Sequence, residues 1–518
     1  MKGNYLARLR LAGLSDVKYC LPWALPTPIT TKNAKYPSMR HLQTILIMPC
    51  LGILVGCVNP LQVSEPHPGA PLPEKWTAPG EMAAKGMAIE KPESEREATA
   101  DADAGGAPPD DSIPSWIGDF DDPKLPALVK EAVGKNFDIE VALARVKAAR
   151  ARAKREGAEK LPDIDGAFSA SRARSGLTGT TANNFDLGID IGWEIDLWNR
   201  LDNAAKAAVA EAKAQELDYL MARLSLAANV ANAWFDAIES EQQLRLAEKT
   251  IVSFENSLDT IERQYRLGIG TALDVRLTRE NVASARSQRE IRARNRDTAA
   301  RALEILLGRY PSATLDIPPN LPGLQREIPV GLPSDLLDRR PDIIAANARL
   351  LAADHQLAVA RANRLPGIRL TASGGTASGE LRELLRPDSL AWSLLGGLTQ
   401  PLWDGGRLAA DVEVASADRQ RAGAEYALVA LRAFREVESA LTAEVLLANQ
   451  EAALDVAAQE AKAAVALAME QYQRGLSDIV TLLSTQRREF DARSSFLFIA
   501  KQRLTTRVDL YLALGGGF

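Results

Sequence analysis

The strongest constraint on the fold is the stretch 184–198, in which apolar and polar residues alternate strictly. Its odd positions, such as Phe185, Trp193 and Leu197, are all apolar. The acids among its even positions are Asp186, Asp190, Glu194 and Asp196. This period of two predicts a β-strand with one apolar and one polar face. Because acids pack poorly in a protein core, a strand between lipid and water satisfies the whole pattern. A surface strand of a soluble sheet explains this segment alone equally well, and the rest of the sequence favours the membrane alternative.

Composition and motifs exclude several classes of protein. The net charge of −5 over 518 residues does not indicate a nucleic-acid-binding protein, which would typically be basic. The only cysteines, Cys20, Cys50 and Cys57, precede residue 60, and there are three histidines. The rest of the chain therefore cannot build a disulfide framework, a zinc cluster or a Cys/His catalytic pair, and we predict no metal site. Phosphate-binding and hydrolase motifs are also missing from the sequence, so we expect no enzyme and no cofactor.

The chain carries a candidate lipoprotein signal. Met39-Arg40-His41 precedes a mostly apolar run, 42–55, which ends at Gly56-Cys57. The segment 54–57 resembles the bacterial lipobox, which implies cleavage before Cys57, acylation of that residue and, with Val58 next, sorting to the outer membrane. We interpret 39–56 as the signal peptide and 1–38 as an over-long gene-model extension. The alternative is a chance cysteine after an apolar run.

Residues 57–123 differ in composition from everything that follows. They are rich in Pro, Gly, Ala and Glu, with acidic patches such as Asp101–Asp103. Such a composition buries too little apolar surface to order itself. We therefore expect a flexible or chain-wrapping segment that connects the lipid anchor to the folded body.

Long helices dominate the remainder. Proline is absent from 163–310 and from 402–518, and both stretches are rich in strong helix formers. The run 199–264 alone would be about 100 Å long at 1.5 Å per residue. Helices of this length are typical of coiled coils and helical arrays, and the apolar stripe along this run needs partner helices.

The second half of the chain repeats the first. The matching pairs are Leu161-Pro162 with Leu365-Pro366, Leu197-Trp198 with Leu402-Trp403, and Gln264-Tyr265 with Gln471-Tyr472. They occur in the same order at similar separations, so a duplication is the simplest account. We predict a first repeat at 124–310, a linker at 311–333 and a second repeat at 334–518.

Each repeat is predicted to contain a helix, two strands, a long helix and a further helix. In the first repeat these are 124–160, 164–174, 185–197, 199–264 and 272–307. In the second they are 334–364, 368–373, 392–400, 404–472 and 478–514. Four strands are too few to close a membrane barrel, and open edges cannot face lipid. If the strands are in the membrane, the strands of several subunits must form one closed barrel, and a trimer would supply twelve strands.

Two motifs carry a family resemblance. The first, Arg339-Arg340-Pro341-Asp342, opens the second repeat; as a local feature it is a charged helix start with proline in the first turn. The second runs from Tyr472 to Gly475 and is followed by Asp478 and Leu482-Leu483. Residues 112–518 together with the lipobox thus resemble the TolC/OprM-type outer-membrane factor family, in particular its lipoprotein efflux members.

The resemblance implies a mixed α/β, mainly α, membrane protein. It implies a homotrimer whose twelve-stranded outer-membrane β-barrel, with four strands per subunit, continues into a long periplasmic α-helical coiled-coil barrel. The implied function is the exit duct of a tripartite efflux pump. The implied partners are outer-membrane lipid, a periplasmic adaptor and an inner-membrane transporter, with the RND type expected. A type I secretion duct and, less favoured, a periplasmic adaptor lipoprotein are the alternatives.

The resemblance also suggests which residues carry transport. Asp186, Asp190, Glu194 and Asp196 would line the pore, although simple solvation explains them equally well. The periplasmic gate would involve Asp478, Arg474, Arg266, Thr481 and Ser484. Thr481 and Ser484 stand where related channels have carboxylates, which puts an acidic constriction in doubt. Arg474 and Arg266 would form inter-helix salt bridges, although exposed charges near helix ends are common.

The two inter-helix turns are the candidate docking sites for the adaptor. Gly268 and Gly475 occupy matching positions in them, where a positive φ would be needed.

Overall fold

The computed structural model describes Trp76 and residues 114–177, 179–324, 331 and 333–516. All of these belong to one compact unit, Val63–Phe518. The predicted extension 1–38, the signal peptide 39–56 and the lipidation site Cys57 lie outside the described residues.

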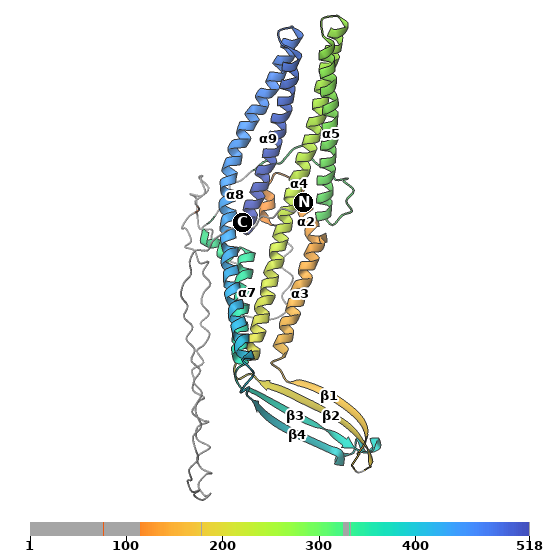
Figure 1. Ribbon diagram of the computed structural model, residues 1–518, viewed down its shortest axis with the longest axis vertical. Helices are drawn as coiled ribbons and strands as arrows, with labels where there is room; N and C mark the ends of the chain where they lie inside the picture. Colours follow the sequence, from red (N-terminus) through yellow and green to blue (C-terminus); the bar gives the residue numbers. More distant parts are fainter. Residues whose placement is uncertain (1–75, 77–113, 178, 325–330, 332, 517–518) are drawn as a thin grey trace, which may run out of the picture. The chain divides into compact units, whose positions relative to one another are not determined.

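The two repeats have nearly identical elements (Figure 1). The first contains α2 (Leu125–Lys135), α3 (Phe137–Ala158), β1 (Asp163–Arg174), β2 (Thr181–Ile195), α4 (Arg200–Arg266) and α5 (Ala272–Leu306). The second contains α6 (Leu336–Arg339), α7 (Pro341–Ala362), β3 (Gly367–Ser378), β4 (Leu390–Thr399), α8 (Arg407–Gln473) and α9 (Ile479–Ala513). Short 3₁₀ segments are η2 (Ser115–Asp119), η3 (Pro333–Asp335), η4 (Leu381–Glu383) and η5 (Pro387–Ser389). Since α4 and α8 both have 67 residues, and α5 and α9 both have 35, the duplication is plain in the structure.

The first predicted helix, 124–160, is in fact two helices. The break falls at Asn136, which has an extended backbone and accepts a hydrogen bond from the N–H of Asp138. Its side-chain amide donates to the carbonyl of Leu306 at the end of α5. Asn136 thus caps α3 and ties it to α5, and a capping interaction of this kind outweighs a continuous helical pattern.

The first helix of the second repeat also differs from the prediction. It was expected to begin at residue 334, but α7 begins at Pro341 after the four-residue helix α6. Between them Arg340 is extended, with φ −76° and ψ 120°. A residue before proline avoids the helical region for steric reasons, so Pro341 can only start the helix.

The four strands form one antiparallel sheet in the order β1-β2-β3-β4. Register aligns Ile164 with Ile191, Ile191 with Ala372, and Ala372 with Leu394. This row is apolar, and the adjacent row, formed by Asp165, Asp190, Ser373 and Ser393, is polar. The sheet therefore has the two chemically distinct faces that the alternation in β2 predicts. Strand β3 extends to Ser378, five residues beyond the predicted end at residue 373.

The helices form a layer that continues from the sheet. α3 packs on α4, α4 on α7, and α7 on α8 (Figure 1). Farther from the sheet, α4 pairs with α5 and α8 with α9, and α4 also contacts α9. The turns that join α4 to α5 and α8 to α9 lie at the ends of α4 and α8 remote from the strands.

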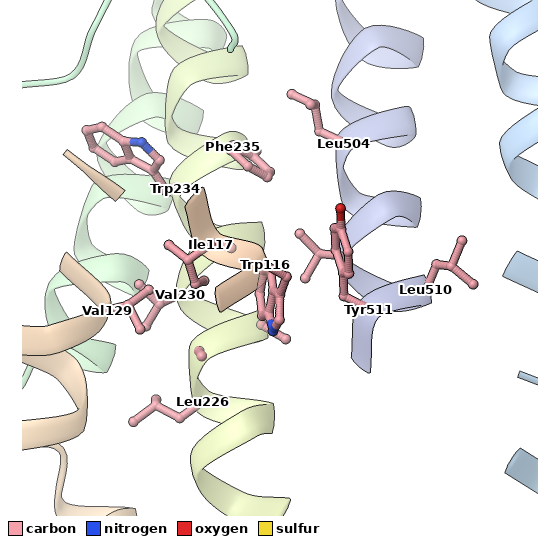
Figure 2. Close-up of a cluster of buried hydrophobic side chains, with 14 of the residues drawn as sticks. Trp116, Ile117, Val129, Leu226, Val230, Trp234, Phe235, Leu504, Leu510 and Tyr511 are labelled. Atoms are coloured by element: carbon pink, nitrogen blue, oxygen red, sulfur yellow. The ribbon is translucent and has the colours of Figure 1, made fainter. Parts of the chain in front are cut away.

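The main core lies where the short N-terminal elements meet α4 and α9. Trp116 stacks on Tyr511, with ring centroids 5.4 Å apart and planes 14° from parallel, and Ile117 lies beside them (Figure 2). Phe120 contacts the ring of Phe235 in α4. Of the two alternatives expected for 57–123, a flexible or a chain-wrapping segment, the flexible one does not hold for residues 114–123, because these large aromatic side chains are buried in the core.

One residue farther upstream is packed in the same way. Trp76 is buried against Phe434 of α8, and its indole N–H donates to the carbonyl of Gly331 at 3.1 Å. Trp76 is therefore part of the packed body of the protein.

Among the described residues, none of the helices is both long and apolar enough to cross a membrane.

Candidate functional site

The polar face of the sheet carries more acid than the sequence pattern alone suggested. Asp190 of β2 lies opposite Asp165 of β1 and Ser373 of β3. Asp186 accepts hydrogen bonds from Ser169, at 3.0 Å, and from Asn184, at 2.6 Å. The pore-lining prediction overlooked Asp165, because β1 alternates less clearly than β2; its register with Asp190 becomes visible only in the sheet.

Two of the four predicted pore-lining acids are held by α4. Arg200 forms a two-pronged ion pair with Glu194, with N–O distances of 2.9 and 2.8 Å. Asp196 accepts hydrogen bonds from the backbone N–H groups of Leu201 and Asp202, at 3.1 and 2.8 Å. It follows the end of β2 at Ile195, so the prediction that it lies on the strand face is wrong. A carboxylate at a helix N-terminus satisfies otherwise unpaired N–H groups, which explains its position.

A cavity of about 230 Å³ lies at this junction of sheet and helices. Its lining includes Glu194, Asp196, Trp198, Arg200 and Pro366. The indole N–H of Trp198 donates to the carbonyl of Pro366 at 2.7 Å, so the junction of β2 with α4 is tied to the junction of α7 with β3.

The two inter-helix turns have the same geometry. Gly268 has φ +78° and Gly475 has φ +72°, so the predicted positive φ is confirmed at both. The N–H of Gly268 donates to Tyr265 and that of Ile269 to Gln264, and the N–H of Gly475 donates to Tyr472 and that of Leu476 to Gln471. These paired bonds are the glycine-dependent helix ending in which a left-handed residue satisfies the last carbonyls. The repeated local sequence therefore encodes a repeated turn.

Around both turns, large apolar side chains face solvent in the subunit. The most exposed are Leu267, Ile269, Leu273, Leu476 and Val480. An apolar group of this kind at a helix tip is typical of an interaction surface.

Asp478 has a defined local role at the second turn. Its side chain accepts the N–H of Thr481 at 2.7 Å and so caps α9. The hydrogen bonds from Thr481 lower the pKa of Asp478 below its usual range. Ser484 donates its hydroxyl to the carbonyl of Thr481 at 2.9 Å. Asp478, Thr481 and Ser484 thus form the first turn of α9, and the carboxylate is ionised there.

The predicted salt bridges of Arg474 and Arg266 do not join helices within the subunit. Arg474 pairs with Glu470, one turn earlier on α8, at 2.5 Å. Arg266 donates to the backbone carbonyl of Glu262 on its own helix at 3.3 Å. The corresponding inter-helix bridge is Arg279 of α5 to Glu262 of α4, at 2.7 Å. Arg266 is the last residue of α4, where a basic side chain reaches the final carbonyls, so Glu262 is left to α5.

The two hairpins are joined by neutral polar contacts that sequence reasoning missed. Gln486 of α9 donates to the hydroxyls of Ser253 and Ser257 on α4, both at 2.9 Å. Farther along, Gln243 of α4 donates to the carbonyl of Ser494, whose hydroxyl donates back at 2.8 Å. Amide and hydroxyl side chains inside long helices follow no recognisable spacing, so this contact could not be predicted from the sequence.

The motif at the start of α7 is a structural junction. Arg340 is buried and donates to both carboxylate oxygens of Asp342, to Glu436 of α8 and to the carbonyl of Ala513. Pro341 is the first residue of α7, and Arg339 is only partly buried. Arg340 thus joins the start of α7 to α8 and to the end of α9.

These features define the class of the protein. A sheet with one apolar and one polar face and two open edges, continued by two long helical hairpins, is the architecture of an outer-membrane channel subunit.

Comparison with known proteins gives the family. The family described as outer membrane efflux protein matches residues 128–309 and 332–516, that is, each repeat in turn. The chain therefore belongs to the outer membrane efflux protein family.

The chain is similar to outer membrane proteins of two Pseudomonas species. The outer membrane protein OprJ of Pseudomonas aeruginosa is 34% identical over 412 residues, which cover 78% of this chain and 86% of OprJ. The solvent efflux pump outer membrane protein SrpC of Pseudomonas putida is 32% identical, covering 77% of this chain and 86% of SrpC. A crystal structure of a membrane protein from Pseudomonas aeruginosa, 32% identical, matches with a TM-score of 0.76 over 87% of this chain and 99% of that one.

The fold class, the function and the location expected from the sequence are confirmed. The protein is a mainly α-helical channel of the outer membrane that extends into the periplasm and acts as the exit duct of an efflux system. Its four strands belong to a trimeric twelve-stranded barrel, as in the structural neighbours. The family is one of transport ducts.

Proposed function

We propose that the protein is the outer-membrane component of a tripartite pump whose inner-membrane transporter is of the RND type, linked to it by a periplasmic adaptor. The observation that carries this proposal is the match of both repeats to efflux channels, one of them named for solvent efflux. The family description and the name of SrpC both refer to efflux, which favours small exported molecules over a type I secretion substrate.

Conduction would follow the polar face of the sheet. Asp165, Asp186 and Asp190 lie on that face, and three copies of each would give the lumen a negative field. Such a field favours cations and zwitterions over anions. Glu194 adds less to it, because its charge is matched by Arg200.

Adaptor docking would use the two glycine turns. Their exposed leucine, isoleucine and valine side chains offer an apolar surface, and the two turns present it with the same backbone geometry. Two like turns in each of three subunits would offer six similar sites to adaptor hairpins. This supports Gly268 and Gly475 as the residues that shape the docking turns.

The periplasmic gate would lie at the same end of the subunit. Asp478 stays ionised at the start of α9, and three copies near the axis would repel one another or bind a cation. Arg474 and Arg266 lie next to the turns, and their contacts across subunits would add to closure. Thr481 and Ser484 supply no charge, so Asp478 would be the main acidic group of the constriction.

The anchor would be the acylated Cys57. The support is the lipobox-like segment 54–57 after a basic start and an apolar run. Two or more acyl chains hold a protein stably on a membrane where one is marginal.

Copurification tests the proposed partners. The channel is affinity-purified after mild chemical cross-linking of intact cells, and its partners are identified by mass spectrometry. We expect an adaptor together with an RND-type transporter. Recovery of an ATP-driven secretion transporter instead would assign the duct to type I secretion. A Gly268→Val, Gly475→Val double variant serves as the control for contacts made through the docking turns.

A further inference from the structure

The outer helices of the layer, α3 and α8, are each covered on one side only near the sheet. α3 packs on α4 and α8 packs on α7, and in the described part of the chain no other helix packs extensively on their far sides there. The same elements lead to the open edges of the sheet, because α3 precedes β1 and α8 follows β4. If β4 of one copy pairs with β1 of the next, α8 of the first must lie beside α3 of the second.

The uncovered sides carry exposed alanines at coiled-coil spacing. On α3 they are Ala144, Ala151 and Ala158, and on α8 they are Ala410, Ala417 and Ala424. Within each set the residues are seven apart, so each set forms one stripe. The stripes lie opposite the buried positions of the same helices, such as Val146 of α3 and Tyr426 of α8. Alanine lets two helices approach closely, as a tight seam requires.

Opposite charges flank these stripes. Between residues 141 and 158, α3 has six cations and one acid. Two of the cations, Arg145 and Arg152, are exposed, lie seven residues apart, and have no ion-pair partner in the described part of the chain.

The flank of α8 is acidic, with Asp411, Asp418 and Glu425 exposed and seven residues apart. Asp418 and Glu425 pair with Arg421 on their own helix at 3.3 and 3.1 Å, and their side chains remain more than half exposed. Exposed pairs of this kind are weak, so these carboxylates are available to a second cation.

Ion pairs within the subunit show which residues of neighbouring helices lie at the same distance from the sheet along the helix axes. Arg150 of α3 pairs with Glu216 of α4 at 2.7 Å. Asp218 of α4 pairs with Arg349 of α7, and Asp354 of α7 pairs with Arg419 of α8. These pairs connect α3, α4, α7 and α8 in turn. They place Arg150 of α3 at about the same distance from the sheet as residues 419–422 of α8.

At this distance from the sheet, the basic flank of α3 in one copy would face the acidic flank of α8 in the next. α3 runs toward the sheet and α8 runs away from it, so an antiparallel seam would place Arg152 between Asp418 and Glu425. Arg145 then lies on the other side of Glu425. With 3.6 residues per turn, the arginine flank of α3 and the acidic flank of α8 fall on the same side of the alanine seam.

We propose that α3 of one subunit packs against α8 of the next in an antiparallel alanine seam, and that Arg145 and Arg152 pair with Asp418 and Glu425 across it. The occupant of each open helix face is thus a second copy of this chain. The inference rests on the trimeric channel of the proposed function and adds to it the contact that fixes the register between subunits. Single exposed ion pairs contribute little, but three seams with several pairs each act together.

Disulfide cross-linking tests the seam directly. The chain has no cysteine after Cys57, so introduced pairs are the only free thiols of the folded body. Ala151→Cys with Ala424→Cys should give covalent dimers and trimers on mild oxidation of the channel in outer-membrane vesicles. The control is Ala151→Cys with Ala410→Cys, which uses the same stripe at a position about 21 Å away along α8. We expect little or no cross-linking there.

Charge reversal tests the flanks. Arg145→Glu with Arg152→Glu, or Asp418→Arg with Glu425→Arg, should raise the dissociated fraction of detergent-purified channel about tenfold at low salt. Combining all four substitutions should restore the trimer, because the pairs are re-formed with opposite sign. The matched control is Asp388→Arg with Glu460→Arg, which makes the same change in charge at exposed acids outside the seam.

Each outcome decides a separate point. Cross-linking at Ala151 and Ala424 together with rescue by the charge swap supports the seam. If the wild type is a trimer but the Ala151→Cys, Ala424→Cys variant does not cross-link, the seam is overturned, the proposed function stays intact, and the basic flank of α3 is assigned to another anionic partner. A trimer that cross-links but ignores all charge reversals overturns the ion pairs. A wild-type chain that is not a trimer overturns the proposed assembly itself.

Discussion

The side-chain amide of Gln486 donates a 2.9 Å hydrogen bond to the hydroxyl of Ser257, and this buried contact joins the two helical hairpins of the subunit. Ser253 accepts a second bond from the same amide. Apolar side chains from α4, α5, α8 and α9 surround the contact, among them Ile261 and Leu482. Neutral polar groups next to a small apolar cluster thus help to set the relative position of the hairpins, together with the ion pair of Lys501 with Asp236.

Replacing Gln486 should loosen the hairpins without unfolding the subunit. Gln486→Ala removes both bonds and leaves the serine hydroxyls of α4 buried, at a local cost of about 1–3 kcal/mol. Amide hydrogen exchange in the first turns of α9 should rise by roughly tenfold or more. The matched control is Gln459→Ala, because Gln459 is exposed and bonds only to Asp455 on its own helix. Unchanged protection in Gln486→Ala would show that the apolar contacts alone hold the hairpins.

Arg340 should be essential for the stability of the folded body. Arg340→Met leaves Asp342 and Glu436 without their cation and the carbonyl of Ala513 without its donor. Breaking a buried pair of this kind costs about 3–5 kcal/mol, so the unfolding temperature should fall clearly. Arg340→Lys should rescue only part of the loss, because lysine cannot match the two-pronged contact. Arg435→Met, at an exposed arginine of α8, is the control, and an equal loss there would contradict the assignment.

The docking turns should tolerate asparagine better than valine. Gly268 and Gly475 have positive φ, which costs a residue with a β-carbon roughly 1–2 kcal/mol and is worst for β-branched side chains. Gly268→Val with Gly475→Val should leave the trimer intact and abolish pump-dependent resistance of the cells. The corresponding double asparagine variant should retain most of it, because asparagine enters this region readily. A fully active pump with both valines would contradict the role of the turns in docking.

Acid should weaken the contact between α2 and the chain after α5. Hydrogen bonds from Arg309 and Lys135 lower the pKa of Glu131 from 4.5 to about 2, although partial burial opposes the shift. Because the folded-state pKa is the lower one, the stabilisation is fully present above pH 4.5 and is lost as the pH falls toward 2. Thermal unfolding of Glu131→Gln should therefore show less loss of stability between these pH values than the wild type. Glu140→Gln, at an exposed glutamate of α3, should behave as the wild type does, and identical pH profiles for all three would contradict the assignment.

The sequence predicted best what is encoded by periodicity and by repetition. The alternation around Trp193 predicted both the strand and its two unlike faces. The matching segments at Gln264 and Gln471 predicted a long helix, a turn and a further helix in each repeat, with glycines of positive φ at Gly268 and Gly475. These signals are local, and duplication presents each of them twice.

Single polar side chains that choose a partner across space could not be predicted in this way. Asn136 splits a helix by capping it, and Asp196 leaves the strand face for the N-terminus of α4. Glu262 binds Arg279 of the next helix, and Arg266 turns to its own backbone. In each case several nearby polar residues could have formed the interaction, and the tertiary structure determined which of them did.

Native mass spectrometry of the channel, extracted in detergent from its own outer membrane, tests the central claim most directly. We expect a trimer whose subunits begin at an acylated Cys57. This result would verify both the barrel shared by three subunits and the lipid anchor. A monomer or dimer with an unmodified amino terminus would leave the edges of β1 and β4 unpaired, and it would contradict the account of this chain as an outer-membrane duct.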